Sequence, residues 1–143
     1  MSEFLSEEWL RELEDSGSEL PKGEISIISQ YEISGTGQGK IHFYTVIENG
    51  QFTEVAVGKH KDADCGISTN AAEAFKILSG EKKVMEAFMQ GDLKVKGDYK
   101  RYLLEFDSIR KSGPWKEMCK SMVLGTDQHW VSVQEDQSLN QGN

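Results

Sequence analysis

Three glycines in close succession give residues 35–39 of this 143-residue chain the composition of a nucleotide-binding loop. A phosphate-binding loop follows a strand and opens a helix, because the amides at the helix N-terminus hold the phosphate. The segment Gly35-Thr36-Gly37-Gln38-Gly39 has strand-like sequence on both sides. We therefore predict a flexible connection between two strands and no nucleotide site.

Histidine, cysteine and serine are the side chains that would serve acid–base, metal or nucleophilic chemistry. His42, His60 and His129 are scattered and lack the spacing of metal ligands. Cys65 and Cys119 show no CxxC spacing and no activating neighbour, and no serine stands in a GxSxG sequence. We expect both cysteines to be reduced and buried. We interpret His42 as a half-buried structural residue, with an acid–base role in a cavity as the alternative. These patterns predict no catalytic residue, no metal site and no cofactor.

The charge balance limits the partners of the chain. It has 16 basic and 24 acidic residues, which give a net charge of −8, and an acidic surface repels nucleic acid and anionic lipid headgroups. Residues 1–15 lack the basic start and apolar run of a signal peptide, and no stretch approaches the ~18 apolar residues of a membrane span. We expect a cytoplasmic protein with no nucleic-acid partner and at most transient membrane contact.

The methionines form a pattern that could line a pocket. Besides Met1 there are four, arranged as the i, i+4 pairs Met85/Met89 and Met118/Met122. Thioether side chains are flexible and polarizable, so they suit pockets that adapt to the shape of a ligand. Ordinary filling of the core is the alternative, and the pattern alone favours it.

Hydrophobic periodicity predicts the elements that would position these residues. A first helix should begin after Ser6 and end in a linker over residues 15–23. Period-two alternation predicts four strands, over residues 25–33, 41–48, 52–57 and 63–69, with a tight hairpin at Asn49-Gly50. We expect one domain over residues 1–133 and a disordered polar tail over residues 134–143.

Helical periodicity dominates the second half of the chain. A helix capped by Asn70 is predicted to end at Gly80, and a second short helix that carries Val84, Met85, Phe88 and Met89 to end at Gly91. A short strand is predicted over residues 93–96. Asp98 should cap a regular helix that carries Tyr99, Tyr102, Leu103 and Phe106 on its apolar face. Pro114 should open a last helix with Trp115, Met118, Cys119 and Met122 on one face. Strands followed by helices in this order indicate an α+β fold.

Three segments together resemble a known family. They are Ala63-Asp64-Cys65-Gly66-Ile67, residues 74–80, and residues 87–98 with the sequence AFMQGDLKVKGD. This pattern is similar to the sterol carrier protein type two (sterol-transfer, SCP-2-like) family, in particular its prokaryotic stand-alone members, over roughly residues 4–122.

The resemblance implies a five-stranded, mostly antiparallel sheet with helices packed on one face and an apolar tunnel between them. It implies a lipid-like ligand, namely a sterol, a fatty acid or a fatty acyl-CoA, and neither a catalytic triad nor a metal. The residues carried over as facing the sheet or the tunnel are Phe75, Leu78, Met85, Phe88, Met89, Leu93, Val95, Leu103 and Phe106. The last helix would cover the tunnel mouth with Trp115, Met118 and Met122.

The sequence thus predicts a non-catalytic intracellular lipid carrier. One alternative is a small cavity enzyme of the cyclase or isomerase type, using His42 or a buried carboxylate. Another is an interaction module without ligand that forms a homodimer through the sheet edge or the Trp130-Val131 segment. An apolar cavity would favour the lipid carrier. An inward-facing histidine or aspartate would favour the cavity enzyme, and a sealed core without a cavity would favour the interaction module.

Overall fold

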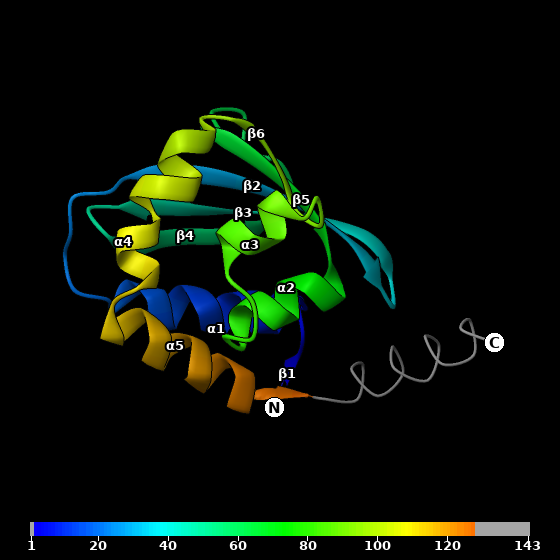
Figure 1. Cartoon of the computed structure of the whole chain (residues 1–143). Helices are drawn as coiled ribbons and strands as arrows, with labels where there is room; N and C mark the ends of the chain where they lie inside the picture. The colour runs from blue at the N-terminus through cyan, green and yellow to red at the C-terminus, as the bar shows by residue number, and fades with distance from the viewer. Residues whose placement is uncertain (1, 128–143) are drawn as a thin grey trace.

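The computed structural model describes residues 2–127. Within them, five strands form one sheet, and α1, α2 and α5 lie below it (Figure 1). The sheet consists of β2 (Ile27–Thr36), β3 (Gly39–Glu48), β4 (Gln51–Val57), β5 (Cys65–Asn70) and β6 (Lys94–Gly97). The helices are α1 (Glu7–Ser18), α2 (Ala71–Leu78), α3 (Val84–Met89), the π-helix η1 (Arg101–Glu105), α4 (Asp107–Arg110) and α5 (Gly113–Leu124). The predicted α+β class is confirmed.

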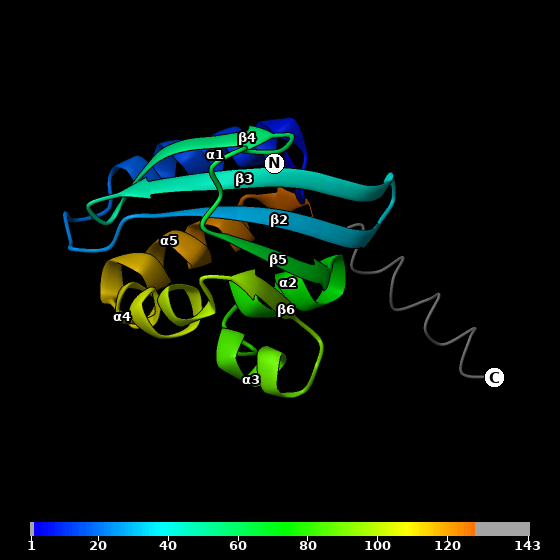
Figure 2. The ribbon, with the colours of Figure 1, turned by 90° about the horizontal axis from the view of Figure 1, so that it is seen from above.

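The sheet has the strand order β4-β3-β2-β5-β6. Only β2 and β5 run parallel within it, and the other neighbouring strands are antiparallel. The connection from β4 to β5 crosses β3 and β2 on the face away from the helices (Figure 2). Gln30 holds this connection, because its Nε2 donates to the Gly58 carbonyl (2.9 Å) and its Oε1 accepts from the His60 amide (2.8 Å).

Both predicted strand connections are confirmed. Asn49 and Gly50 have φ angles of 51° and 80°, as a two-residue hairpin with positive φ at both positions requires. The glycine-containing segment joins β2 to β3, with Thr36 opposite Gly39. No helix follows it, and the strand-to-strand connection lacks the helix-end amides of a nucleotide loop.

The first helix is longer than predicted. Ser6 caps it as expected, since its Oγ accepts from the Trp9 amide, but the helix continues to Ser18 through the segment predicted as a linker. The reason lies in packing, because Gly17 is buried where the helix meets Phe52 of β4. A Cβ atom at Gly17 would lie 2.4 Å from Cγ of Phe52. The glycine therefore permits close approach of α1 to the sheet rather than ending the helix.

The helix after β6 also differs from the prediction. Asp98 caps it as expected, because its Oδ1 accepts from the Arg101 amide (3.2 Å). The regular helix is replaced by η1 and α4, and the Phe106 amide donates to the Arg101 carbonyl five residues back (2.8 Å). The extra residue in this turn shifts the helical register. Tyr102 and Phe106 are buried, whereas Tyr99, predicted on the same apolar face, is 49% exposed.

The two ends of the described chain lie side by side, which sequence periodicity did not predict. The short strands β1 (Ser2–Glu3) and β7 (Thr126–Asp127) pair in parallel. The indole Nε1 of Trp9 donates to Oγ1 of the fully buried Thr126 (2.8 Å). The predictions for His129, for the Trp130-Val131 segment and for a tail over residues 134–143 lie outside the described residues.

Candidate functional site

The helix-covered face of the sheet is mostly apolar, with the buried pair Ser29 and Thr45 as polar exceptions near its centre. Its most buried apolar side chains belong to Ile27 and Ile33 of β2, Ile47 of β3 and Ile67 of β5, each 1% exposed. They alternate with side chains on the open face because successive strand residues point in opposite directions. The space between the sheet and the helices is therefore a mostly apolar interior.

Aromatic rings line the part of this interior that lies between the sheet and the helices η1, α4 and α5. Tyr31 of β2 stacks on Phe43 of β3, with ring centroids 4.9 Å apart, and meets Tyr102 of η1 edge-on at 6.2 Å. Phe106 lies 5.8 Å from Tyr102 and 5.4 Å from Trp115 of α5. The rings make one continuous row from the sheet to the last helix. We call these five residues the aromatic row.

Two polar groups interrupt the apolar character of the aromatic row. The hydroxyls of Tyr31 and Tyr102 share a hydrogen bond of 3.0 Å. The guanidinium of Arg110, the last residue of α4, lies over the rings of Tyr102 and Phe106, with its Cζ 4.6 Å and 4.3 Å from the two centroids. Nη1 and Nη2 of Arg110 are buried and have no hydrogen-bond partner among residues 2–127.

The titration behaviour of the buried groups does not suit nucleophilic catalysis. Burial raises the pKa of Cys65, and it raises that of Cys119 to about 11, so both thiols stay protonated near neutral pH, whereas a reactive cysteine has a lowered pKa. Both cysteines are buried and free, as predicted. Burial also raises the pKa values of Tyr31 and Tyr102 and outweighs the opposite effect of the Arg110 charge, so their hydroxyls remain hydrogen-bond donors over the physiological range.

The residues predicted from the sequence to line the tunnel occupy three kinds of position. Leu93, Leu103, Phe106, Met118 and Met122 are buried in the core. Phe75, Leu78, Met85, Val95 and Trp115 are partly buried and pack against that core. Phe88 and Met89 of α3 are 36% and 79% exposed, because this short helix turns Val84 and Ala87 inward instead. The structure therefore brings the α5 methionines, but not Met89, to the interior.

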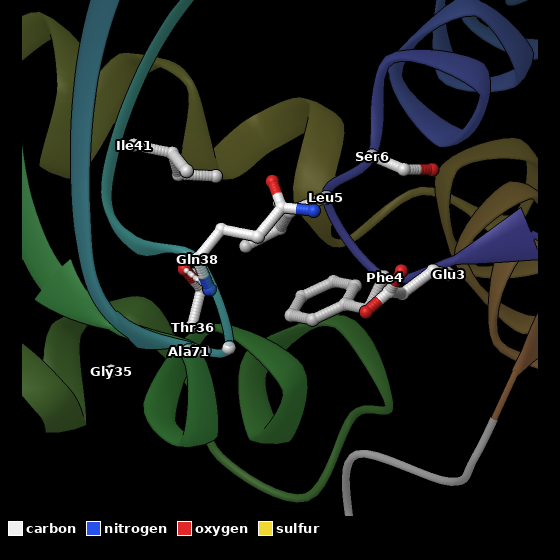
Figure 3. A pocket seen from close by; sticks show the side chains of 10 residues that line it. Glu3, Phe4, Leu5, Ser6, Gly35, Thr36, Gln38, Ile41 and Ala71 are labelled. Atoms are coloured by element: carbon white, nitrogen blue, oxygen red, sulfur yellow. Dashed lines mark hydrogen bonds between the residues drawn. The ribbon is translucent and has the colours of Figure 1, made fainter.

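A small pocket opens at one end of the interior, where the N-terminal segment meets the β2–β3 connection (Figure 3). It has a volume of about 50 Å³, and its apolar walls are Phe4, Leu5, Ile41 and Ala71. Gln38 reaches from the connection towards the N-terminal segment. The ring of Phe4 lies 5.3 Å from that of Phe75 and connects this pocket to the predicted lining residues.

The open face of the sheet carries polar groups. A groove of about 290 Å³ there is lined by side chains that include Glu32, Lys40 and Ser68. The Glu32 carboxylate already pairs with Lys40 and accepts a hydrogen bond from Ser68. His42 lies opposite Glu32 in the strand register, and His60 packs on Tyr44 of the same face. Neither described histidine faces the apolar interior. His42 is therefore not placed to act as an acid or a base inside a cavity between the sheet and the helices.

Within residues 2–127, no group of His, Cys, Asp and Glu side chains is arranged to hold a metal ion. No helix in the same range is long and apolar enough to cross a bilayer.

The model of the SCP-2 sterol transfer family matches residues 15–104. The chain belongs to this family. Membership supports a role in lipid binding and transfer, and it confirms the resemblance that residues 63–67 and 87–98 indicated. A comparison with curated protein sequences gives no match.

Solved structures of SCP-2 proteins share the fold. A crystal structure of sterol carrier protein 2 superposes with a TM-score of 0.65 at 15% identity, over 84% of this chain and 97% of the other. A protein from Thermus thermophilus, described as possibly a sterol carrier protein, gives a TM-score of 0.59 at 14% identity, over 85% and 91%. Palmitated SCP2L2 from Aedes aegypti gives 0.57 at 19% identity, over 76% and 95%.

Sequence reasoning missed several residues of the candidate site. Phe4 and Leu5 precede the first helix, and the positive φ of Leu5 (65°) gives no signal in the sequence. Arg110 belongs to no motif that the sequence analysis singled out. Only the π-turn, which changes the direction of the segment after Phe106, brings it over the aromatic rings. Tyr31 lies in the predicted strand over residues 25–33, but its hydroxyl contact with Tyr102 of η1 depends on the tertiary fold.

Proposed function

We propose that this protein is a non-catalytic carrier that encloses one lipid-like ligand, namely a fatty acid, a fatty acyl-CoA or a sterol-like molecule, between its sheet and its helical layer. The observation that carries the proposal is the apolar interior lined by the aromatic row, by Met118 and by Met122, in a chain of the SCP-2 family. The palmitated SCP2L2 structure lends further support, since its fold is the same.

Burial of apolar area supplies the binding free energy of such a carrier. Each buried methylene contributes ~0.8 kcal/mol, so a sixteen-carbon chain offers on the order of 10 kcal/mol. Ordering of the chain and of the side chains around it offsets part of that gain. Micromolar affinity and weak selectivity for chain length follow, because an apolar wall discriminates little between neighbouring chain lengths.

The ligand needs more room than the described pocket offers. Sites that enclose small molecules have volumes of roughly 300–1,000 Å³, whereas the pocket beside Phe4 measures about 50 Å³. The proposal therefore requires the helical layer to move away from the sheet when a ligand binds. The segment from η1 to α5 is suited to this movement, because it consists of a π-helix, a helix of four residues and the two-residue connection Lys111-Ser112.

Mass spectrometry of the purified protein tests the proposal without a choice of ligand. The full chain is purified without detergent, measured under native conditions, and then extracted with organic solvent. We expect an added mass that corresponds to one lipid per chain and a lipid in the extract. A delipidated sample serves as the control, and it should regain the added mass when incubated with palmitate. A protein that carries no lipid and takes up none contradicts the proposal.

A further inference from the structure

The guanidinium of Arg110 is a cation whose terminal nitrogens are buried without a counter-ion. Among residues 2–127, its Nη1 and Nη2 atoms have no hydrogen-bond partner and no salt bridge includes this residue. Its neighbour Lys111, by contrast, pairs with Asp107 at 3.0 Å. Removing a charge from water without pairing it is costly, and stacking on Tyr102 and Phe106 compensates only in part. No anionic side chain among residues 2–127 therefore balances the charge of Arg110.

The groups around Arg110 add a further donor. Tyr31 and Tyr102 share one hydrogen bond between their hydroxyls, which uses only one of their two protons. Arginine has no acceptor, so the cluster as a whole offers more hydrogen-bond donors than acceptors. Burial keeps both phenols protonated, as the raised pKa values of Tyr31 and Tyr102 indicate. A ligand group that fits must accept several hydrogen bonds and carry negative charge.

We propose that Arg110, with the hydroxyl pair of Tyr31 and Tyr102, binds the carboxylate of an alkyl carboxylic acid whose chain lies along the aromatic row. A planar carboxylate matches the fork of donors on a guanidinium. The rings of Phe106 and Trp115 continue from the guanidinium as an apolar surface suited to an alkyl chain. This inference rests on the proposed carrier function and selects the free fatty acid among its ligand classes.

Two ligands of equal chain length and different headgroup test this assignment. Binding of palmitate and of hexadecanol to the delipidated full chain is measured by competition with a fluorescent probe, for the native protein and for Arg110→Met. We expect Arg110→Met to weaken palmitate binding about tenfold or more, since hydrogen bonds to a charged group have that effect. Hexadecanol binding should stay within about twofold. Arg110→Lys keeps the charge without the fork and should give an intermediate loss of palmitate binding.

Lys111→Met is the matched control, because it removes an equal charge from the next residue, where the side chain is 76% exposed. It should leave both ligands unaffected. Urea melts of all variants check folding, and Arg110→Met should be as stable as the native protein, since it removes an unpaired buried charge.

The outcomes distinguish this inference from the carrier function itself. Equal binding of palmitate to native protein and Arg110→Met overturns the carboxylate assignment and leaves the carrier function standing. Equal losses for palmitate and hexadecanol also overturn it, because Arg110 would then act through packing alone. If the native protein binds neither ligand, both proposals fail.

Discussion

Substitution of Gly17 by alanine tests how α1 is held against the sheet. In an ordinary helix this change stabilises by about 1 kcal/mol. Here the new Cβ would lie 2.4 Å, 2.6 Å and 2.8 Å from Cγ, Cδ1 and Cβ of Phe52. These atoms lie near the root of the side chain, so rotation alone cannot remove them and the strand or the helix must shift. Overpacking of this kind costs about 1–3 kcal/mol, which exceeds the gain in helix propensity.

We therefore expect Gly17→Ala to lower the free energy of unfolding in urea, by up to about 2 kcal/mol. Gly113→Ala is the control, because Gly113 begins α5 and a Cβ there meets no atom within 4 Å. That variant should be unchanged or slightly more stable. Adding Phe52→Leu to Gly17→Ala should relieve part of the loss, as a double-mutant cycle would measure. A Gly17→Ala protein as stable as Gly113→Ala would refute the close contact between α1 and β4.

Three further predictions concern the cap, the interior and the titration of a buried thiol. Asp98→Ala should cost ~1 kcal/mol in urea melts because the cap is lost, whereas Asp98→Asn should stay near native stability, and equal losses would show that the charge matters more than the cap. Met118→Trp should weaken fatty-acid binding in a fluorescence titration more than it lowers stability, while Met89→Trp at the surface should change neither, and a reversed order would place the ligand elsewhere. Because burial raises the pKa of Cys119 from 9.0 to about 11, the unfolded thiol loses its proton first. The free energy of unfolding should then fall as the pH rises from 9 to 11, and it should fall less steeply for Cys119→Ala. Parallel curves of unfolding free energy against pH for the two proteins would contradict this prediction.

The order of the elements follows from local sequence signals. Alternation of apolar residues defines β2 to β5, the Asn49-Gly50 pair defines the β3–β4 turn, and Ser6, Asn70 and Asp98 cap their helices. The geometry of the β6 exit also depends on one residue, since Gly97 has φ 80° and a Cβ there would lie 2.6 Å from the Asp64 carbonyl oxygen. Turns, caps and strand ends can be predicted from the sequence because a single residue determines the local backbone conformation at each of them.

Tertiary contacts decide the features that the sequence did not predict. Gly17 normally signals the end of a helix, but here it lies where a strand packs closely. Met85 and Met89 share a helical face by spacing, yet α3 is too short to bury both. The π-turn in η1 has no local signature, and the position of Arg110 depends on it. The lining role of the residues from Phe75 to Met122 stays a prediction, because it concerns the state with a ligand.

Titration of the delipidated full chain with a fluorescent fatty-acid analogue tests the carrier function most directly. We expect a saturable signal with one ligand per chain and micromolar affinity, reversed by competing unlabelled palmitate. Heat-unfolded protein provides the baseline for nonspecific partition. A signal that does not saturate with fatty acids, acyl-CoA or sterols, in protein whose urea melt is cooperative, would contradict the carrier function.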